Sequence, residues 1–118
     1  MLTREQILQH TLPTESVPCP EFGDSATLTV RRMTAKEFLA LNAKLKAEPD
    51  LAFAHWITAT VVDASGNKMF TEADVVALAD KDFVLVNRLA EAAIRVNGDG
   101  RAQAEKNSTT RSSDSSTA

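Results

Sequence analysis

The clearest alternation of apolar and polar side chains lies at residues 26–31, where alanine, leucine and valine alternate with threonine and arginine. This period of two is typical of a half-buried β-strand. Residues 16–22 contain two prolines, which lack the N–H that a strand donates, so this segment is predicted to be extended and to lie at a sheet edge. With a turn at Gly23, the pattern predicts one β-hairpin over residues 15–33. An isolated hairpin is marginal in water, so its apolar face should lie on helices.

Three threonines mark expected helix starts. Thr3 and Thr34 each stand three residues before a glutamine or glutamate, which is the pattern of a capping box, and Thr71 gives a third N-cap signal. These signals predict a short N-terminal helix, a longer helix that ends near Lys46, and a short helix over residues 75–79.

Two further helices are expected to form the core. Residues 51–62 are the most apolar segment and are predicted to form a central helix, although the β-branched run at their end also suits a strand. Asp80 or Asp82 would cap the last helix, and Asn97-Gly98 would end it, because both residues tolerate a left-handed backbone. One broad apolar face of this helix is formed by Phe83, Val86, Leu89, Ala90, Ala93, Ile94 and Val96.

These elements predict an α+β fold, in which an N-terminal β-hairpin packs on a mainly α-helical domain of four to five helices. The length of 118 residues favours one domain, which we assign to residues 1–100. Residues 101–118 would form a Ser/Thr-rich tail. Residues 108–118 carry no large apolar side chain to offset the entropy of ordering, so we expect the tail to be disordered.

Charge and composition exclude several classes of protein. The net charge is −3 and no basic stripe is present, so we expect no nucleic-acid binding. No apolar run approaches the roughly 20 residues that span a bilayer, and the N-terminus lacks the apolar core of a signal peptide. A single cysteine, Cys19, excludes an internal disulfide and a cysteine-rich zinc site. The expected location is therefore the cytoplasm, without membrane contact.

Residues with catalytic potential are few. His10 and His55 lack the spacing of a metal site, and Cys19 has no recognisable base, so we predict no catalytic, metal or cofactor site and no enzyme activity. The segment 63–74 places oxygen ligands at some positions of a calcium loop. However, Lys68 stands where that loop needs glycine, so a helix-to-helix turn is the stronger interpretation.

Short motifs stand in a distinctive order along residues 56–98. In chain order they are Trp56, Val61-Val62-Asp63, Gly66-Asn67, Phe70-Thr71-Glu72-Ala73-Asp74-Val75, Leu78, Arg88-Leu89-Ala90-Glu91-Ala92-Ala93 and Asn97-Gly98. Upstream lie an LTREQIL start, the proline-containing hairpin and a TAKEF helix start. In this order and spacing, about residues 2–107 resemble the tail assembly chaperones of long-tailed bacteriophages.

The resemblance implies a protein that binds the tape measure protein and recruits tail-tube (major tail) subunits, and it leaves self-association open. It also implies a location in the host cytoplasm and absence from the mature virion. Phe22, Trp56 and Phe70 are the aromatic residues expected to contact the partner, and the alternative for each is a place in the core. The alternative function is a small structural tail or head–tail completion protein that stays in the virion.

The resemblance also gives meaning to Glu105-Lys106-Asn107. These residues can be encoded as GAA-AAA-AAC, which contains a heptamer on which ribosomes slip back by one base. Tail chaperones of this kind are commonly made in two forms by such a slip, so Lys106 and Asn107 mark a candidate frameshift position. The alternative is an ordinary solvated linker.

Overall fold

The predicted hairpin is present in the computed structural model, which describes the backbone of residues 1–113 and the side chains of residues 1–98. Strands β1 (Thr14–Pro18) and β2 (Thr27–Arg31) pair antiparallel. Between them lie the 3₁₀ turn η1 (Pro20–Phe22) and Gly23. Gly23 has a φ of 130°, which glycine adopts without strain and other residues adopt only with strain. The sheet order is β1-β2-β3, so β1 is an edge strand, as the prolines of this segment predicted.

The third strand corrects the expectation of one helix over residues 51–62. After the 3₁₀ turn η2 (Pro49–Leu51), helix α3 (Ala52–Thr60) ends two residues early. Val61 and Val62 form the short strand β3, which pairs antiparallel with β2. β-branched side chains fit a pleated sheet better than a helix, and the competing strand propensity therefore prevails at these two residues.

The predicted helix starts are confirmed at all three threonines. Thr3, Thr34 and Thr71 each form a capping box with the side chain three residues on. The elements that follow them are α1 (Arg4–Leu8), α2 (Ala35–Ala47), and the 3₁₀ turn η3 (Glu72–Asp74) with α4 (Val75–Ala79).

Helix α5 (Phe83–Ser113) begins as expected, since the Asp82 carboxylate accepts a hydrogen bond from the Val84 N–H at 3.1 Å. The predicted stop at Asn97-Gly98 is wrong, because α5 continues through both residues. The Asn97 side chain instead bonds inside the helix, where its Nδ2 donates to the Ala93 carbonyl at 2.8 Å. The expected disordered tail, residues 101–118, lies outside the residues whose side chains are described and stays a prediction.

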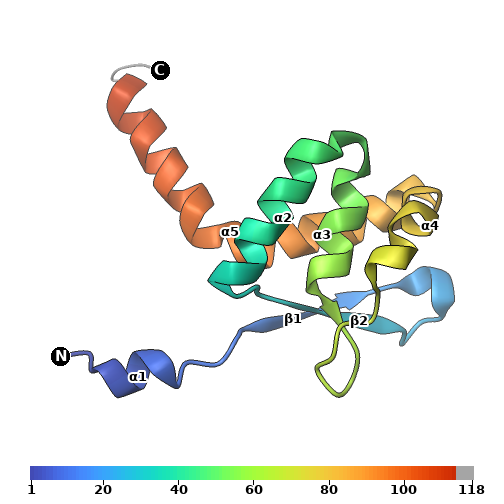
Figure 1. The fold of residues 1–118 in the computed structure, drawn as a ribbon, viewed down its shortest axis with the longest axis horizontal. Helices are drawn as coiled ribbons and strands as arrows, with labels where there is room; N and C mark the ends of the chain where they lie inside the picture. Colours follow the sequence, from blue (N-terminus) through green and yellow to red (C-terminus); the bar gives the residue numbers. More distant parts are fainter. Residues whose placement is uncertain (114–118) are drawn as a thin grey trace.

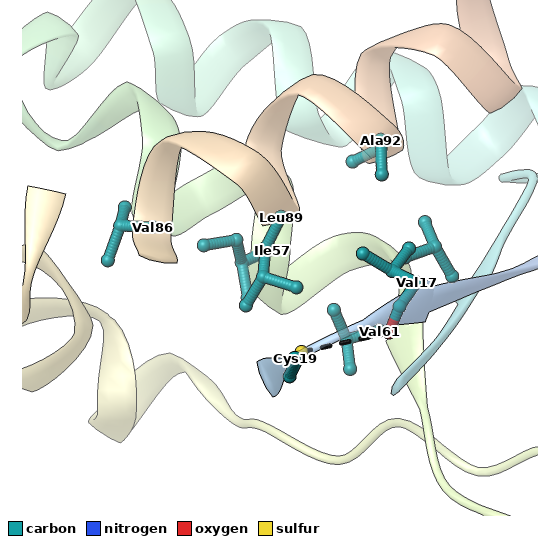
Figure 2. Close-up of a cluster of buried hydrophobic side chains, with 9 residues drawn as sticks. Val17, Cys19, Ile57, Val61, Val86, Leu89 and Ala92 are labelled. Carbon is teal, nitrogen blue, oxygen red and sulfur yellow. Dashed lines mark hydrogen bonds between the residues drawn. The ribbon is translucent and has the colours of Figure 1, made fainter. Parts of the chain in front are cut away.

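The core lies where α3, α5 and the hairpin meet (Figure 1). α3 is the central helix, as predicted, and contacts α2, α4 and α5. Figure 2 shows side chains from these elements converging in one cluster. Its buried members are Val17, Cys19, Val30, Ile57, Val61, Val86, Leu89, Ala92 and Ala93.

Two residues of the expected apolar face of α5 are not buried. Phe83 is 66% exposed and Ile94 is 42% exposed. The ring of Phe83 lies beside that of Phe53, with 6.4 Å between the ring centroids, at an end of the helix that other elements leave open to solvent. Within the described residues, no helix combines the length and the apolar character needed to cross a bilayer.

Candidate functional site: an apolar groove

An apolar groove of about 570 Å³ lies between the hairpin turn, α4 and the first turns of α5. Ile57, Val86 and Leu89 belong to the core and line the groove from within. Its outer lining comes from segments far apart in the sequence, and includes Phe22, Leu28, Met69, Phe70 and Leu78. The groove therefore exists only once the hairpin, the central helix and α5 have packed together.

Phe22 is the most exposed large apolar side chain in the groove lining, with 70% of its surface accessible to solvent. Its backbone is nevertheless held in place by the turn. The Phe22 N–H donates to the Cys19 carbonyl at 3.0 Å, and the Gly23 N–H donates to the Pro20 carbonyl at 3.1 Å. An aromatic ring on a hydrogen-bonded turn loses little freedom when a partner covers it, which favours binding.

An ion pair ties this turn to α5. The Arg88 guanidinium donates to the Glu21 carboxylate at 2.6 Å. That hydrogen bond is the main reason why the pKa of Glu21 lies below its ordinary value and the pKa of Arg88 above it. Both groups are therefore charged at neutral pH, and the pair holds the hairpin turn against α5.

The opposite wall is formed by Met69 and Phe70. The Met69 N–H donates to the Val61 carbonyl at 3.1 Å, which attaches this segment to the sheet. Met69 is 42% exposed, while Phe70 is half-buried and packs against the core. A methionine at the surface of a groove adapts to differently shaped apolar partners, because its side chain is unbranched and flexible.

The structure brings together two of the three aromatic residues expected to bind a partner. Phe22 and Phe70 line the same groove, whereas Trp56 is half-buried against the core and is absent from the lining. Sequence reasoning did not name Met69 or Leu78 as contact residues. Met69 was noted only as an apolar residue near a turn, and Leu78 only as part of a short helix and of the ordered motifs. Neither signal identifies a groove built from distant segments.

Two of the three groups with catalytic potential, Cys19 and His55, are buried. Cys19 is 2% exposed, its Sγ–H donates to the Val17 carbonyl at 3.7 Å, and burial raises the pKa of its thiol. His55 is 3% exposed and its Nε2 lies 2.8 Å from Glu48 Oε1, while its Nδ1 has no hydrogen-bond partner. His10 lies apart from both and is exposed. No described pair among them has the arrangement of a nucleophile and its base.

In the loop considered for calcium, the carboxylate of Asp63 accepts hydrogen bonds from the backbone of the loop itself. Asp63 Oδ1 accepts hydrogen bonds from the N–H groups of Ser65 at 2.9 Å and Asn67 at 3.1 Å, so it closes the turn. Among the side chains that the structure describes, no group of three or more His, Cys, Asp or Glu could hold a metal ion.

Comparison with solved structures shows a likeness in fold. No protein-family model matches the chain, and no curated protein sequence matches it. The solved structure of the bacteriophage HK97 tail assembly chaperone is similar in fold, with a TM-score of 0.59 and 14% sequence identity. The likeness covers 78% of this chain and 90% of that protein. The α+β arrangement of this chain is thus shared with a phage tail assembly chaperone.

Proposed function

We propose that this protein is a phage tail assembly chaperone, whose apolar groove binds amphipathic helices of the tape measure protein. The observation that carries the proposal is Phe22, an exposed aromatic residue held over an apolar groove whose other wall is Phe70. The fold likeness to a tail assembly chaperone supports the same conclusion.

A groove of this kind suits a helical partner. An amphipathic helix places apolar side chains at positions i, i+3, i+4 and i+7, and can lay them into an apolar groove between helices. Grooves of about 300–1,000 Å³ hold a few side chains rather than a whole domain, so each contact is modest. Many modest contacts along one long helix would still give strong overall binding, because the sites are linked.

In the proposed role, the protein keeps the tape measure protein soluble and recruits tail-tube subunits around it. It would act in the host cytoplasm, without catalysis, and leave before the virion is complete. A protein that must leave should bind through many reversible contacts, which agrees with an open groove rather than a closed cavity.

Co-expression with the neighbouring tape measure protein tests the proposal. We expect the tape measure protein to become soluble and to co-purify with this chain. Mass spectrometry of purified virions is the second measurement, and we expect this chain to be absent. A stoichiometric amount in the virion would favour the structural tail protein instead.

A longer form made by frameshifting is part of the same proposal. Lys106 and Asn107, the candidate slip position, lie outside the residues whose side chains are described. We expect the gene to read A-AAA-AAC there, and the expressed gene to yield a minor product longer than 118 residues. An AAG codon for Lys106 would remove that heptamer. If the short form alone fails to bind, co-expression of the longer product decides whether it is required.

A further inference from the structure

A second, smaller cavity lies at the first turn of α5. It has a volume of about 210 Å³, and its apolar lining includes Leu51, Phe53 and Phe83. Phe53 is 40% exposed and Phe83 is 66% exposed, and their ring centroids lie 6.4 Å apart. Single exposed apolar residues are ordinary, but apolar side chains gathered at one pocket mark a surface that a partner covers. We call this cavity the second pocket.

The second pocket adjoins the apolar groove. Lys81 and Val86 line both cavities. Along α5, Phe83 lines only the second pocket, Val86 lines both, and Leu89 lines only the groove; Val86 and Leu89 are labelled in Figure 2. The first turns of α5 therefore run beside both cavities. At ~1.5 Å of rise per residue, Phe83 and Leu89 lie about 9 Å apart along the helix axis.

A lysine stands where the two cavities meet. Lys81 lies in the connection between α4 and α5, and its N–H donates to the Leu78 carbonyl at 3.1 Å. The residue is exposed, and within residues 1–98 it makes no ion pair. Its neighbours Asp80 and Asp82 line neither cavity, and the Asp82 carboxylate accepts a hydrogen bond from the Val84 N–H. A positive charge without an ion-pair partner in this range therefore separates two apolar surfaces.

We propose that the groove and the second pocket form one docking surface for an amphipathic helix with an acidic residue in the middle of its apolar face. One apolar side chain would lie against Phe53 and Phe83, another would lie in the groove beside Phe22, and the acidic group would face Lys81. Seven residues of helix cover ~10.5 Å, which matches the separation of Phe83 and Leu89. The apolar residues therefore stand at i and i+7, with the acidic residue at i+3 or i+4 on the same face.

The apolar contacts and the ion pair have different roles in this surface. Burial of apolar side chains supplies most of the affinity, whereas a charge pair at the surface mainly selects among partners and fixes their register. Lys81 would thus favour helices with an acidic residue between their apolar residues over helices with a basic one. The inference deepens the proposed function, because it states which tape measure helices would be selected, and it rests on that function only for the identity of the partner.

Two designed helical peptides test the surface without the tape measure protein. The first carries leucine at i−4, i, i+7 and i+11 and glutamate at i+4 on an otherwise polar helix, and the second has lysine in place of that glutamate. Each is titrated with the wild type, Lys81→Glu, Phe83→Glu and Leu39→Glu. Leu39 is 68% exposed and lines neither cavity, so it is the matched control for Phe83. Phe83 lies in the first turn of α5, where the helix dipole favours glutamate, so the variant should fold, and circular dichroism checks this.

The readout is the dissociation constant of each peptide. We expect the wild type to bind the glutamate peptide about three- to tenfold more tightly than the lysine peptide, since exposed charge pairs are modest in strength. Lys81→Glu should reverse this order. Phe83→Glu should weaken both peptides at least about tenfold, because it places a charge against a leucine that it must help to bury. Leu39→Glu should leave both constants within about twofold of the wild type.

Any of three results would overturn the inference: the wild type binds neither peptide at millimolar concentration, Phe83→Glu binds both as Leu39→Glu does, or Lys81→Glu keeps the wild-type order. Unchanged peptide binding by Phe83→Glu, together with a lower mass of the peptide-free protein in light scattering, would assign the second pocket to a second copy of the chain.

Co-expression with the tape measure protein separates this inference from the proposed function. Equal co-purification with the wild type and Phe83→Glu would contradict the inference and leave the proposed function intact. A tape measure protein that fails to bind the wild type would contradict the proposed function, and the peptides would still decide whether the surface selects helices in this way.

Discussion

The Met33 N–H donates a hydrogen bond of 2.6 Å to the Asn97 side-chain oxygen, which joins residues 64 positions apart in the sequence. The Nδ2 of the same Asn97 side chain donates to the Ala93 carbonyl of its own helix. The two hydrogen bonds together fix the orientation of the Asn97 amide group. Next to it, the Arg32 Nε donates to the Val96 carbonyl at 3.0 Å. α5 is thereby attached to the connection between β2 and α2.

Replacing Asn97 by alanine should therefore weaken the fold. The Met33 N–H would lose its partner, and an unsatisfied, part-buried N–H costs about 1–3 kcal/mol. We expect the free energy of unfolding to fall by this amount in a urea titration. Glu91→Ala, an exposed position on the same helix, is the control and should change it by less than ~0.5 kcal/mol. Equal effects of the two variants would contradict this account.

Two glycines should respond to alanine with opposite signs. Gly66 has a φ of 87°, where an alanine is strained, so Gly66→Ala should cost roughly 1–2 kcal/mol of stability. Gly98 lies inside α5, and an added Cβ would meet only Ile94 Cγ2 at 3.9 Å. Gly98→Ala should therefore stabilise the protein by up to about 1 kcal/mol. Thermal unfolding of both variants checks the signs, and a destabilised Gly98→Ala would show that this turn of α5 is not helical in solution.

Glu37 should make stability depend on pH. Burial acts to raise the pKa of its carboxyl, but hydrogen bonds from the Thr34 N–H and Arg31, with the charges of Arg31 and Lys68, outweigh burial and lower it. Arg31 Nη2 lies 3.0 and 2.9 Å from the two carboxylate oxygens. A lowered folded-state pKa gives stability that is present above the ordinary value of 4.5 and is lost as pH falls through the lowered value.

The measurement is the melting temperature of the wild type and Glu37→Gln between pH 7 and pH 3. We expect the wild type to melt higher at pH 7, and the difference to shrink below pH 4.5. A difference that stays constant across this range would show that the ionised carboxylate does not supply the stability.

Cys19 should react only when the protein opens. Its thiol is 2% exposed and burial raises its pKa, so both access and the thiolate fraction are low. We expect a thiol reagent such as 5,5′-dithiobis(2-nitrobenzoate) to modify native protein at least about 100-fold more slowly than protein in urea. Rapid labelling without urea would mean that the groove opens to the core around β1.

The local parts of the fold were predictable from the sequence. A capping box is decided within four residues, so Thr3, Thr34 and Thr71 all behave as their neighbours predict. The hairpin was predictable for the same reason, because alternation, prolines and Gly23 lie close together. Val61 and Val62 were harder, since the choice between helix and strand depended on β2 as a distant pairing partner.

The groove was only partly predictable. Periodicity shows which side chains of a helix are apolar, but not where neighbouring elements stop covering them, so Phe83 was expected in the core and is exposed. Trp56 was named as a candidate contact with a place in the core as the alternative, and it packs half-buried against the core. Phe22 and Phe70 could be named from the sequence as aromatics beside turns. That they share one groove follows only from the packing of β1, α3 and α5.

The most direct test of the central claim compares two exposed apolar residues in one pull-down. Phe22→Glu places a charge over the groove, and Leu39→Glu places one on α2, outside it; their wild-type side chains are 70% and 68% exposed. Each variant is co-expressed with the tape measure protein, and the amount that co-purifies is measured. We expect Phe22→Glu to retain less than about a tenth of the wild-type amount, since a buried unpaired charge costs several kcal/mol, and Leu39→Glu to retain nearly all. Equal retention by both variants would contradict the assignment of the groove as the binding site.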